Sequence, residues 1–372
     1  MVAMPAVMQF HLVLPSLKIS GGTREALRLA CELDGCNGCT ADVHTMWQSP
    51  HALSGQPLQV VALTSWQTRI GLAAFQLPVI AVRFYRRART QAGDLQPSGV
   101  RWIFTHYATL PLSLLVPRAQ RWYFVQGLEW QFLGQRTLAS RLLKRFMQFA
   151  YRRGTVISAN AYLTQQLRLH GVAVAAEAPI WANERYAVVP GKARDIDVVM
   201  MLRKGRPKRL DLYRQFISTI MRQSPHIRLA IITPEDEIAM AVRKDIATCL
   251  VRPDLPEMAA LYARSRLFVF LSEHEGFGLP PLEAMGAGCV PISRDCGGVR
   301  SYMTGPLEAL IVPLDSDVDA IVDRVLSLLA DEPQRADLGE RAMCAFRAGM
   351  TRTRDRVHAL SPLYRQPSAS WP

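Results

Sequence analysis

The stretch Leu271–Tyr302, LSEHEGFGLPPLEAMGAGCVPISRDCGGVRSY, decides how the second half of this chain folds. An apolar run at 267–271 leads into it. That run is short and rich in Phe and Val, which predicts a buried parallel strand. Gly276 and Gly278 then form a turn, and two prolines open a helix-forming segment, because proline is tolerated in a first helical turn. A strand, a glycine turn and a helix N-terminus together expose backbone N–H groups that suit a phosphate.

Two carboxylates, Glu275 and Glu283, flank this turn with seven residues between them. A carboxylate accepts hydrogen bonds from neighbouring hydroxyls, whereas the turn amides and the helix N-terminus favour an anion. A ligand that carries both hydroxyls and phosphates fits both features. We therefore expect a nucleotide sugar at this turn.

The composition is that of a globular protein with two domains. The chain has 372 residues, of which 49% are hydrophobic and 20% are charged. No apolar run reaches the roughly 18 residues needed to span a bilayer, and the first residues lack the basic segment of a signal peptide. We expect a cytoplasmic protein. Seven scattered cysteines argue against a disulfide framework, and the CxxC at Cys36 and Cys39 has no second pair at zinc spacing.

The positive charge is concentrated in the first half of the chain. Residues 1–190 hold 19 Lys and Arg against 8 Asp and Glu, a net charge of +11, whereas residues 191–372 hold 25 against 23. This asymmetry indicates that the first half faces an anionic partner, namely a membrane surface, a lipid phosphate or a nucleic acid. No zinc finger, RNA-binding signature or GxGxxG supports a nucleic-acid partner, so we do not expect the protein to bind nucleic acid.

Strand and helix patterns alternate through both halves, which predicts parallel sheets with helical crossovers. In the first half we expect strands at 10–14, 42–46, 60–63, 79–83, 102–105, 122–125 and 156–158, and helices at 24–33, 137–151 and 163–169. We expect an N-terminal acceptor-binding domain at 1–178, a linker at 179–194, a donor-binding domain at 195–345 and a tail at 346–372 that returns toward the first domain.

The central stretch resembles the retaining GT-B glycosyltransferases of family four, the glycosyl transferases group 1. Their hallmark is two glutamates separated by seven residues in an EGFGLPxLEAMAxGxP context, and residues 275–291 here read EGFGLPPLEAMGAGCVP. Upstream, Arg203 and Lys208 follow a strand pattern with the spacing of the family's Arg and Lys pair. Gly21 and Gly22 resemble the N-terminal loop that admits the donor's phosphates. The resemblance implies a GT-B fold, that is, two Rossmann-like doubly wound domains facing a cleft.

The resemblance also implies roles for individual residues. Glu283 would hold the ribose hydroxyls and Glu275 would contact the donor sugar. The remaining donor-binding residues would be the two cations and the glycine turn, namely Arg203, Lys208, Gly21, Gly22, Gly276, Phe277, Gly278 and Leu279. Two cations near a helix N-terminus would neutralise a diphosphate leaving group, so no metal or other cofactor is expected.

The sequence departs from the family at two places. Many members carry a histidine near the reacting carbon, where this chain has Gln126, and an amide cannot carry a proton. The sequence Phe124-Val125-Gln126 resembles that of some rhamnosyltransferases of the family. His106 ends the preceding strand pattern, and we include it with Gln126 and Glu275 among the catalytic candidates. Beyond the motif, Val299 stands where the family often has a glutamate after two glycines.

We therefore expect a retaining hexosyltransferase that moves a sugar from a nucleotide-diphosphate sugar to a glycan or lipid-linked acceptor in surface polysaccharide biosynthesis. The alternatives are a nucleotide-sugar epimerase or hydrolase on the same fold, and a non-catalytic sugar-nucleotide-binding protein. The basic, amphipathic segment at 140–151 and the arginines at 83–89 admit two interpretations: ordinary core-packing segments with charged outer faces, or a peripheral docking surface at the inner face of the membrane.

Overall fold

The computed structural model describes residues 8–17, 21–36, 38–47, 60–63, 73–94, 99–133, 137–188, 194–242, 246–353 and 356–365. The chain divides into two compact units. Unit 1 comprises residues 1–180 together with 355–372, and unit 2 comprises residues 181–354. The division falls inside the segment expected to be a linker, between Ile180 and Trp181, and the last segment of the chain belongs to unit 1.

Unit 1 is built on a seven-stranded parallel sheet in the order β3-β2-β1-β4-β5-β6-β7. Its strands are β1 (Met8–Leu14), β2 (Cys39–Thr45), β3 (Val60–Ala62), β4 (Val100–Phe104), β5 (Arg121–Val125), β6 (Thr155–Ser158) and β7 (Ala176–Glu177). The chain first builds outward from β1 to β3 and then returns to place β4 on the other side of β1. The order therefore reverses between β1 and β4, where a sheet of this kind binds ligands beyond the carboxyl ends of its strands.

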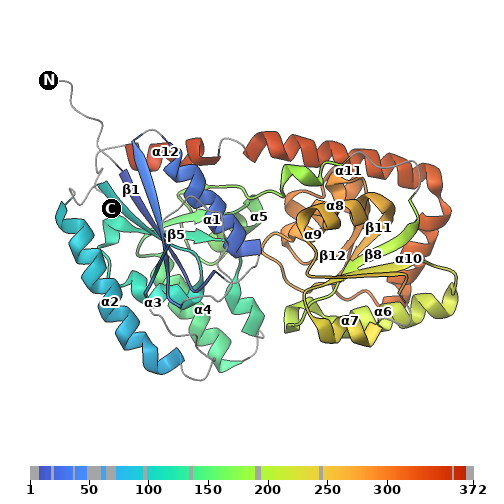
Figure 1. The fold of residues 1–372 in the computed structure, drawn as a ribbon, viewed down its shortest axis with the longest axis horizontal. Coiled ribbons are helices and arrows are strands. Elements are labelled where there is room, and N and C mark those ends of the chain that lie inside the picture. The colour runs from blue at the N-terminus through green and yellow to red at the C-terminus, as the bar shows by residue number, and fades with distance from the viewer. Residues whose placement is uncertain are drawn as a thin grey trace. The chain divides into compact units, whose positions relative to one another are not determined.

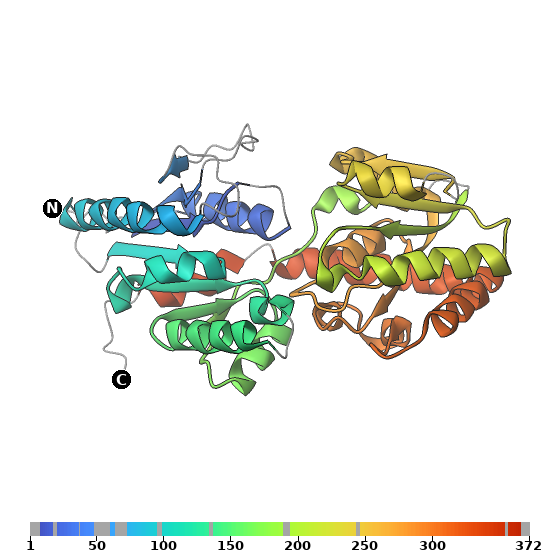
Figure 2. The ribbon, with the colours of Figure 1, turned by 90° about the horizontal axis from the view of Figure 1, so that it is seen from below.

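The helices of unit 1 are α1 (Gly21–Asp34), α2 (Ala73–Asp94), α3 (Leu110–Ser113), α4 (Leu138–Tyr151), α5 (Ala161–Leu169) and α12 (Arg356–Arg365). Helices α2, α3 and α4 lie side by side on one face of the sheet, whereas α1 and α12 cover the other (Figures 1 and 2). Thr137 caps α4, because its side chain accepts a hydrogen bond from the Ser140 N–H. Helix α1 begins three residues earlier than expected, so the two glycines at 21 and 22 lie in its first turn.

The strand expected at 79–83 is wrong, because this segment lies within helix α2. Its buried side chains are Ile80, Phe84 and Ala88, which recur every four residues, as on one face of a helix. Val79 and Val82, at the other helical positions, are about half exposed. The apolar run was short enough to fit either period, and only the spacing of the buried side chains over the following residues distinguishes them.

One polar contact holds α12 against α1. The guanidinium of Arg356 is fully buried and pairs with the carboxylates of Glu25, at 3.0 Å, and Glu32. Burial raises the pKa of Glu25, and the charge of Arg356 opposes that shift. A buried charge needs such partners, because an unpaired one would cost several kcal/mol.

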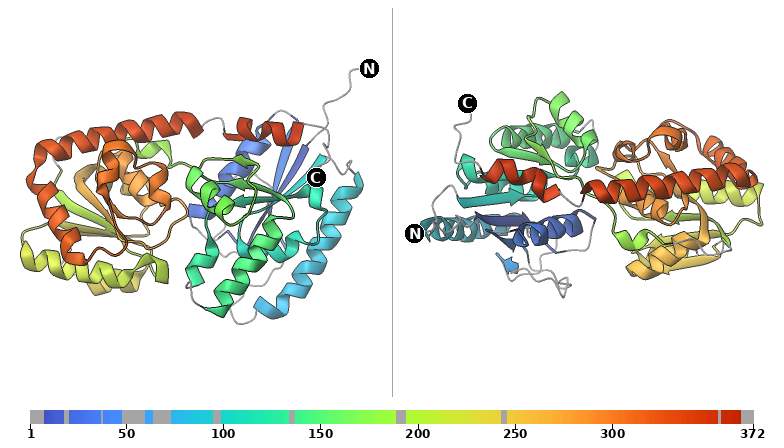
Figure 3. Two further views of the ribbon diagram at one scale, coloured as in Figure 1. Left: turned by 180° about the vertical axis from the view of Figure 1, so that it is seen from behind. Right: turned by 90° about the horizontal axis from the view of Figure 1, so that it is seen from above.

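Unit 2 has a six-stranded parallel sheet in the order β10-β9-β8-β11-β12-β13. The strands are β8 (Ile196–Met201), β9 (Leu229–Thr233), β10 (Thr248–Val251), β11 (Ser265–Phe270), β12 (Val290–Arg294) and β13 (Ile311–Val312). The helices are α6 (Leu210–Gln223), α7 (Asp236–Val242), α8 (Leu255–Arg264), α9 (Leu279–Gly286), α10 (Val318–Ala330) and α11 (Glu332–Thr353). Helices α6, α7 and α10 cover one face, and α8, α9 and α11 the other (Figures 1 and 3). The order reverses between β8 and β11.

Both units are thus doubly wound α/β sheets, as the alternating pattern predicts. Strands β8 and β11 are nearly free of solvent exposure and carry continuous apolar runs, which is the pattern of parallel strands covered on both faces. Among the described residues, no helix combines the length and the apolar character needed to cross a bilayer.

Candidate functional site

The predicted donor residues of unit 2 gather at the carboxyl ends of β8 and β11, the two strands at which the sheet order reverses. Arg203 follows β8, and Glu275 follows β11. The two loops are tied together, since the Glu273 N–H donates to the Pro207 carbonyl at 2.7 Å. Parallel pairing of β8 with β11 brings their ends to one edge, where open α/β sheets hold ligands.

An ion pair joins two residues that the sequence predicts as site residues. Lys208 Nζ lies 2.6 Å from Glu275 Oε1, and both side chains are mostly buried, with exposed fractions of 28% and 14%. The backbone of Glu275 is also fixed, because its N–H donates to the Cys296 carbonyl at 3.0 Å and its carbonyl accepts from the Gly298 N–H at 3.2 Å. A cation and a carboxylate are thus held rigidly beside the glycine turn.

The turn itself depends on glycine at two positions. Gly278 has a φ of +80° and immediately precedes α9, a backbone conformation that L side chains rarely adopt. At Gly298 a Cβ would lie 2.4–2.6 Å from backbone atoms of Phe277, closer than any side chain tolerates. Phe277 packs against the rings of Trp181 and Tyr302, and the Tyr302 hydroxyl donates to the Gly278 carbonyl. The turn is therefore built as one packed piece.

Helix α9 begins at Leu279, whose N–H comes directly after the turn, whereas Pro280 and Pro281 that follow have no N–H. Glu283 lies one turn further along and is buried, with 9% of its surface exposed. The Tyr262 hydroxyl donates to Glu283 Oε2 at 3.4 Å. The two glutamates therefore differ, since Glu275 is paired with a lysine and Glu283 with a neutral hydroxyl. Gly276 and Leu279 are half-buried beside them.

Arg203 is half-buried and, among the residues that the structure describes, forms no ion pair. Beside the Lys208 turn lies an open hollow of about 450 Å³. Its lining residues are Gly205, Arg206, Arg209, Leu210, Asp211 and Glu273. Arg209 adopts a left-handed φ of 49° at the start of α6 and pairs with Asp211 at 2.7 Å. Left-handed backbone is costly for arginine, and such strain gathers at functional sites. The sequence showed only a basic cluster there, which carries no signal for backbone strain.

The predicted residues of unit 1 lie at the carboxyl ends of β1, β4 and β5, three neighbouring strands. A Cβ built on Gly22 would lie 3.3 Å from Gln126 Oε1, so the amide meets the first turn of α1. Gln126 Oε1 is buried and has no hydrogen-bond partner among the described residues. Gly21 lies beside them as the first residue of α1. The structure thus brings the two glycines and Gln126 together.

His106 follows β4 and caps a short 3₁₀ turn, where its Nδ1 accepts a hydrogen bond from the Ala108 N–H at 3.2 Å. Burial lowers the pKa of His106 to about 4, so the imidazole is neutral at pH 7 and its proton is on Nε2. Glu129, which the sequence analysis missed, accepts from the Tyr107 N–H at 3.3 Å. Burial raises the pKa of Glu129 to about 8. A shift of this kind marks a candidate functional acid, and no local sequence pattern reveals it.

Comparison with known proteins shows that part of the chain matches a protein family. Residues 192–343 match the family described as Glycosyl transferases group 1. Among curated proteins, the chain is 45% identical over 82 residues to the O-antigen chain mannosyltransferase B of Escherichia coli, which covers 22% of this chain and 20% of that protein. It is 29% identical over 141 residues to the GDP-mannose:cellobiosyl-diphosphopolyprenol alpha-mannosyltransferase of Xanthomonas campestris, covering 36% and 37%. The aligned segments thus span about a fifth to two fifths of these relatives.

Solved structures resemble the chain over nearly its whole length. Sucrose-phosphate synthase from Thermosynechococcus elongatus has a TM-score of 0.75 at 17% identity, covering 96% of this chain and 98% of that one. WaaG, a glycosyltransferase involved in lipopolysaccharide biosynthesis, has a TM-score of 0.68 at 14% identity, covering 95% and 99%. At these identities the likeness establishes the fold, which is GT-B.

Proposed function

We propose that this protein, whose residues 192–343 form a glycosyl transferases group 1 domain, moves a sugar from a nucleotide-diphosphate sugar to a glycan or lipid-linked acceptor with retention of the anomeric configuration. The observation that carries the proposal is the Lys208–Glu275 pair beside the Gly278 turn and the N-terminus of α9. It combines a cation and a carboxylate with a glycine turn at one strand edge, which are groups that suit a nucleotide sugar.

Each part of unit 2 then has a role toward the donor. Glu283 would accept hydrogen bonds from the ribose hydroxyls, and Glu275 from hydroxyls of the sugar. The diphosphate would lie against Arg203, Lys208 and the amides around Gly278. These groups would stabilise the negative charge that develops as the sugar departs, so that the step requires no metal. The acceptor hydroxyl would attack on the face that the diphosphate leaves, with the diphosphate as base.

Unit 1 would contribute to the other half of the reaction. The Gln126 amide supports hydrogen bonding to the sugar, because its buried oxygen has no partner among the described residues. His106 supports the same assignment only through its position at the end of β4. Neither side chain carries a positive charge at neutral pH, so both would orient rather than neutralise a ligand.

The first test asks which nucleotide sugar the protein binds as its donor. Curated relatives include mannosyltransferases, one of them named for GDP-mannose, which makes GDP-mannose the first donor to try. UDP-sugars and dTDP-rhamnose are the comparison donors. At a hundredfold excess over Kd, the true donor should raise the Tm by roughly 5–10 °C. The same ligand should leave the Tm of Lys208→Ala nearly unchanged. If no nucleotide sugar raises the Tm of the unaltered protein, the donor site is refuted.

The second test separates transfer from the alternatives. Incubation with donor and a lipid-linked acceptor should release nucleoside diphosphate together with a glycosylated product of retained configuration. Nucleoside diphosphate released without a glycan product would instead favour a hydrolase. Donor binding without any turnover would favour a non-catalytic sugar-nucleotide-binding protein.

We further propose that unit 1 docks on an anionic membrane surface through α2, α3 and α4 (Figure 2). Large apolar side chains on these helices and the turn after α3 are exposed, namely Val79, Val82, Tyr85, Leu114, Leu115, Leu138, Leu142 and Phe149. Exposed arginines stand among them at 83, 86, 89, 141 and 145. Apolar side chains ringed by cations suit an anionic lipid surface.

Co-sedimentation with anionic and with zwitterionic vesicles tests this surface. The protein should sediment with anionic vesicles only, and the double variant Arg141→Glu and Arg145→Glu should weaken sedimentation at least tenfold. The matched control is Arg168→Glu on α5, which is equally exposed but lies outside the surface. Equal sedimentation of the variant, the control and the unaltered protein would refute the docking surface.

A further inference from the structure

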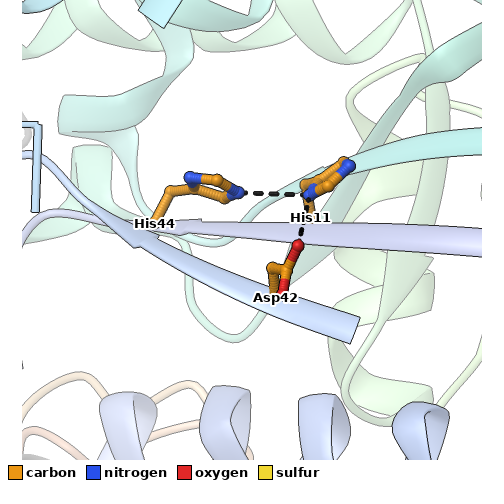
Figure 4. A group of neighbouring side chains, drawn as sticks. All are labelled: His11, Asp42 and His44. Atoms are coloured by element: carbon orange, nitrogen blue, oxygen red, sulfur yellow. Dashed lines mark hydrogen bonds and ion pairs between the residues drawn. The ribbon is translucent and has the colours of Figure 1, made fainter. Parts of the chain in front are cut away.

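Three polar side chains lie together inside unit 1, under helix α2 and apart from the residues assigned to the reaction. His11 comes from β1, and Asp42 and His44 come from β2. The strands pair in parallel with His11 opposite Asp42, and His44 lies two residues further along β2. Residues two apart on a strand point to the same face, so all three side chains converge (Figure 4).

The distances between their polar atoms are those of ligands around one small ion. His11 Nδ1 lies 3.1 Å from His44 Nε2 and 3.5 Å from Asp42 Oδ2. One ligand atom from each residue lies within 4.8 Å of the other two. In a tetrahedral zinc site with bonds of 2.0–2.1 Å, two ligand atoms stand about 3.3 Å apart. Two of the three separations therefore already match without any ion.

Aromatic rings line much of the cluster, and one cation, Arg87 of α2, acts electrostatically on all three groups. Both histidines are fully buried. The ring of Trp102 stacks on His11 with centroids 4.3 Å apart, and Phe84 of α2 packs edge-on against Trp102. His11 Nε2 and His44 Nδ1 have no hydrogen-bond partner among the described residues. These two nitrogens are not the ones that face the cluster, so an ion there would not pair them. Two buried imidazoles that share one hydrogen bond are nevertheless a costly element.

We propose that His11, Asp42 and His44 bind a divalent transition-metal ion of the zinc class. Two imidazoles and one carboxylate are the donor set that such ions favour over Mg²⁺ or Ca²⁺, which prefer oxygen. Asp42, with 19% of its side chain exposed, gives the ion a route of entry and leaves the fourth position to water. The ion links β1 to β2 beneath α2 and stabilises unit 1. It takes no part in the proposed sugar transfer.

The test uses the full-length protein after treatment with a chelator. Zn²⁺ should bind at one equivalent per chain and raise the Tm by roughly 5–10 °C at a hundredfold excess over Kd. Co²⁺ in its place should give the strong visible absorption of a tetrahedral site. Asp42→Asn, at a partly exposed position, should lose the equivalent and the Tm rise while remaining folded. His44→Gln should lose the Co²⁺ spectrum.

The matched control replaces another pair of metal-binding side chains in the same unit. Cys36 and Cys39 have CxxC spacing and form no disulfide, and the double change to serine should leave the bound equivalent and the Tm rise intact. Metal binding that follows the cysteines instead, or that persists in Asp42→Asn, would overturn the proposal. So would the absence of any bound metal in the unaltered protein. Donor binding by unit 2 is measured separately, so a failure here leaves the proposed function unaffected.

Discussion

The two units share one plan and differ in how much their sequences reveal. Each is a parallel sheet whose order reverses next to its first strand, at β1 and β4 in unit 1 and at β8 and β11 in unit 2. Yet the family match covers only residues 192–343, and most of the charge surplus lies in the first half. The predicted site is thus a contiguous sequence motif in unit 2, whereas in unit 1 it consists of isolated positions.

The difference follows from how each site is made. In unit 2 the turn, its two glutamates and the helix N-terminus are consecutive in sequence, so one short segment fixes their geometry. In unit 1, Gly22 in the first turn of α1 and Gln126 after β5 meet, and His106 follows β4, which pairs with both β1 and β5. A site assembled by topology leaves no contiguous pattern. The comparison predicts that changes at the motif of unit 2 have the larger effect on donor binding, whereas changes at the isolated positions of unit 1 have the smaller one.

The largest effect is expected at the ion pair of unit 2. Lys208→Ala removes the cation beside Glu275 and should lower kcat/KM about 10²–10³-fold, the range for losing one group that stabilises developing charge. The control is Lys204→Ala, four residues away. Its lysine pairs with Glu237 in solvent, with exposed fractions of 53% and 74%, so we expect less than a twofold change. Activity that survives in Lys208→Ala would break the assignment of the donor site.

The second effect tests whether the donor turn is a rigid, packed piece. Gly298→Ala would place a Cβ 2.4–2.6 Å from the Phe277 backbone and should destabilise unit 2 by about 2–3 kcal/mol while abolishing the donor-induced Tm shift. Gly305→Ala is the control. Its φ is +60° but no atom lies within 4 Å of the added Cβ, so it should cost about 1 kcal/mol and preserve donor binding. Urea unfolding measures both, and equal costs would contradict the packing.

Sequence reasoning succeeded where an interaction is local and failed where it is not. The strand, glycine turn and helix around Gly278 were predicted because glycine permits a left-handed turn and proline favours a first helical turn, both of which are local effects. The strand expected at 79–83 failed, since a short apolar run has no decisive period. The left-handed Arg209 and the half-buried Glu129 depend on contacts between distant segments, and so does the cluster around His11. No residue spacing within a single segment predicts these features.

The third effect concerns pH and belongs to unit 1. Burial raises the pKa of Glu129 to about 8, whereas an unfolded chain holds it near its ordinary value of 4.5. The folded state therefore keeps a proton that the unfolded state has lost, so the stability from this group falls as pH rises from about 4.5 to 8. Glu129→Gln mimics the protonated form. It should match the unaltered protein at pH 5 and be more stable at pH 8 by roughly 1–2 kcal/mol, since the group is only half-buried.

Thermal unfolding followed across this pH range measures the effect. Glu177→Gln on β7, another half-buried glutamate of unit 1, is the control and should leave the slope of Tm against pH unchanged. An identical slope in Glu129→Gln and in the unaltered protein would contradict a raised pKa of Glu129. The same assay with donor present should give an unchanged donor-induced shift, because Glu129 lies in unit 1.

Gly22→Ala should change stability least among these variants, and its effect on activity is the most informative. Gly22→Ala adds a Cβ 3.3 Å from Gln126 Oε1, at the end of a flexible side chain, and alanine suits a helix better than glycine. Stability should therefore change by less than about 1 kcal/mol. If the Gly22 turn and Gln126 hold part of a substrate, kcat/KM should nevertheless fall roughly tenfold, because the displaced amide loses one hydrogen bond to it. Gly35→Ala, whose added Cβ meets only ordinary contacts of 3.5 and 3.7 Å, controls for an added methyl group at the other end of α1. Full activity in Gly22→Ala would mean that unit 1, despite sharing its plan with unit 2, places its ligand elsewhere on the sheet.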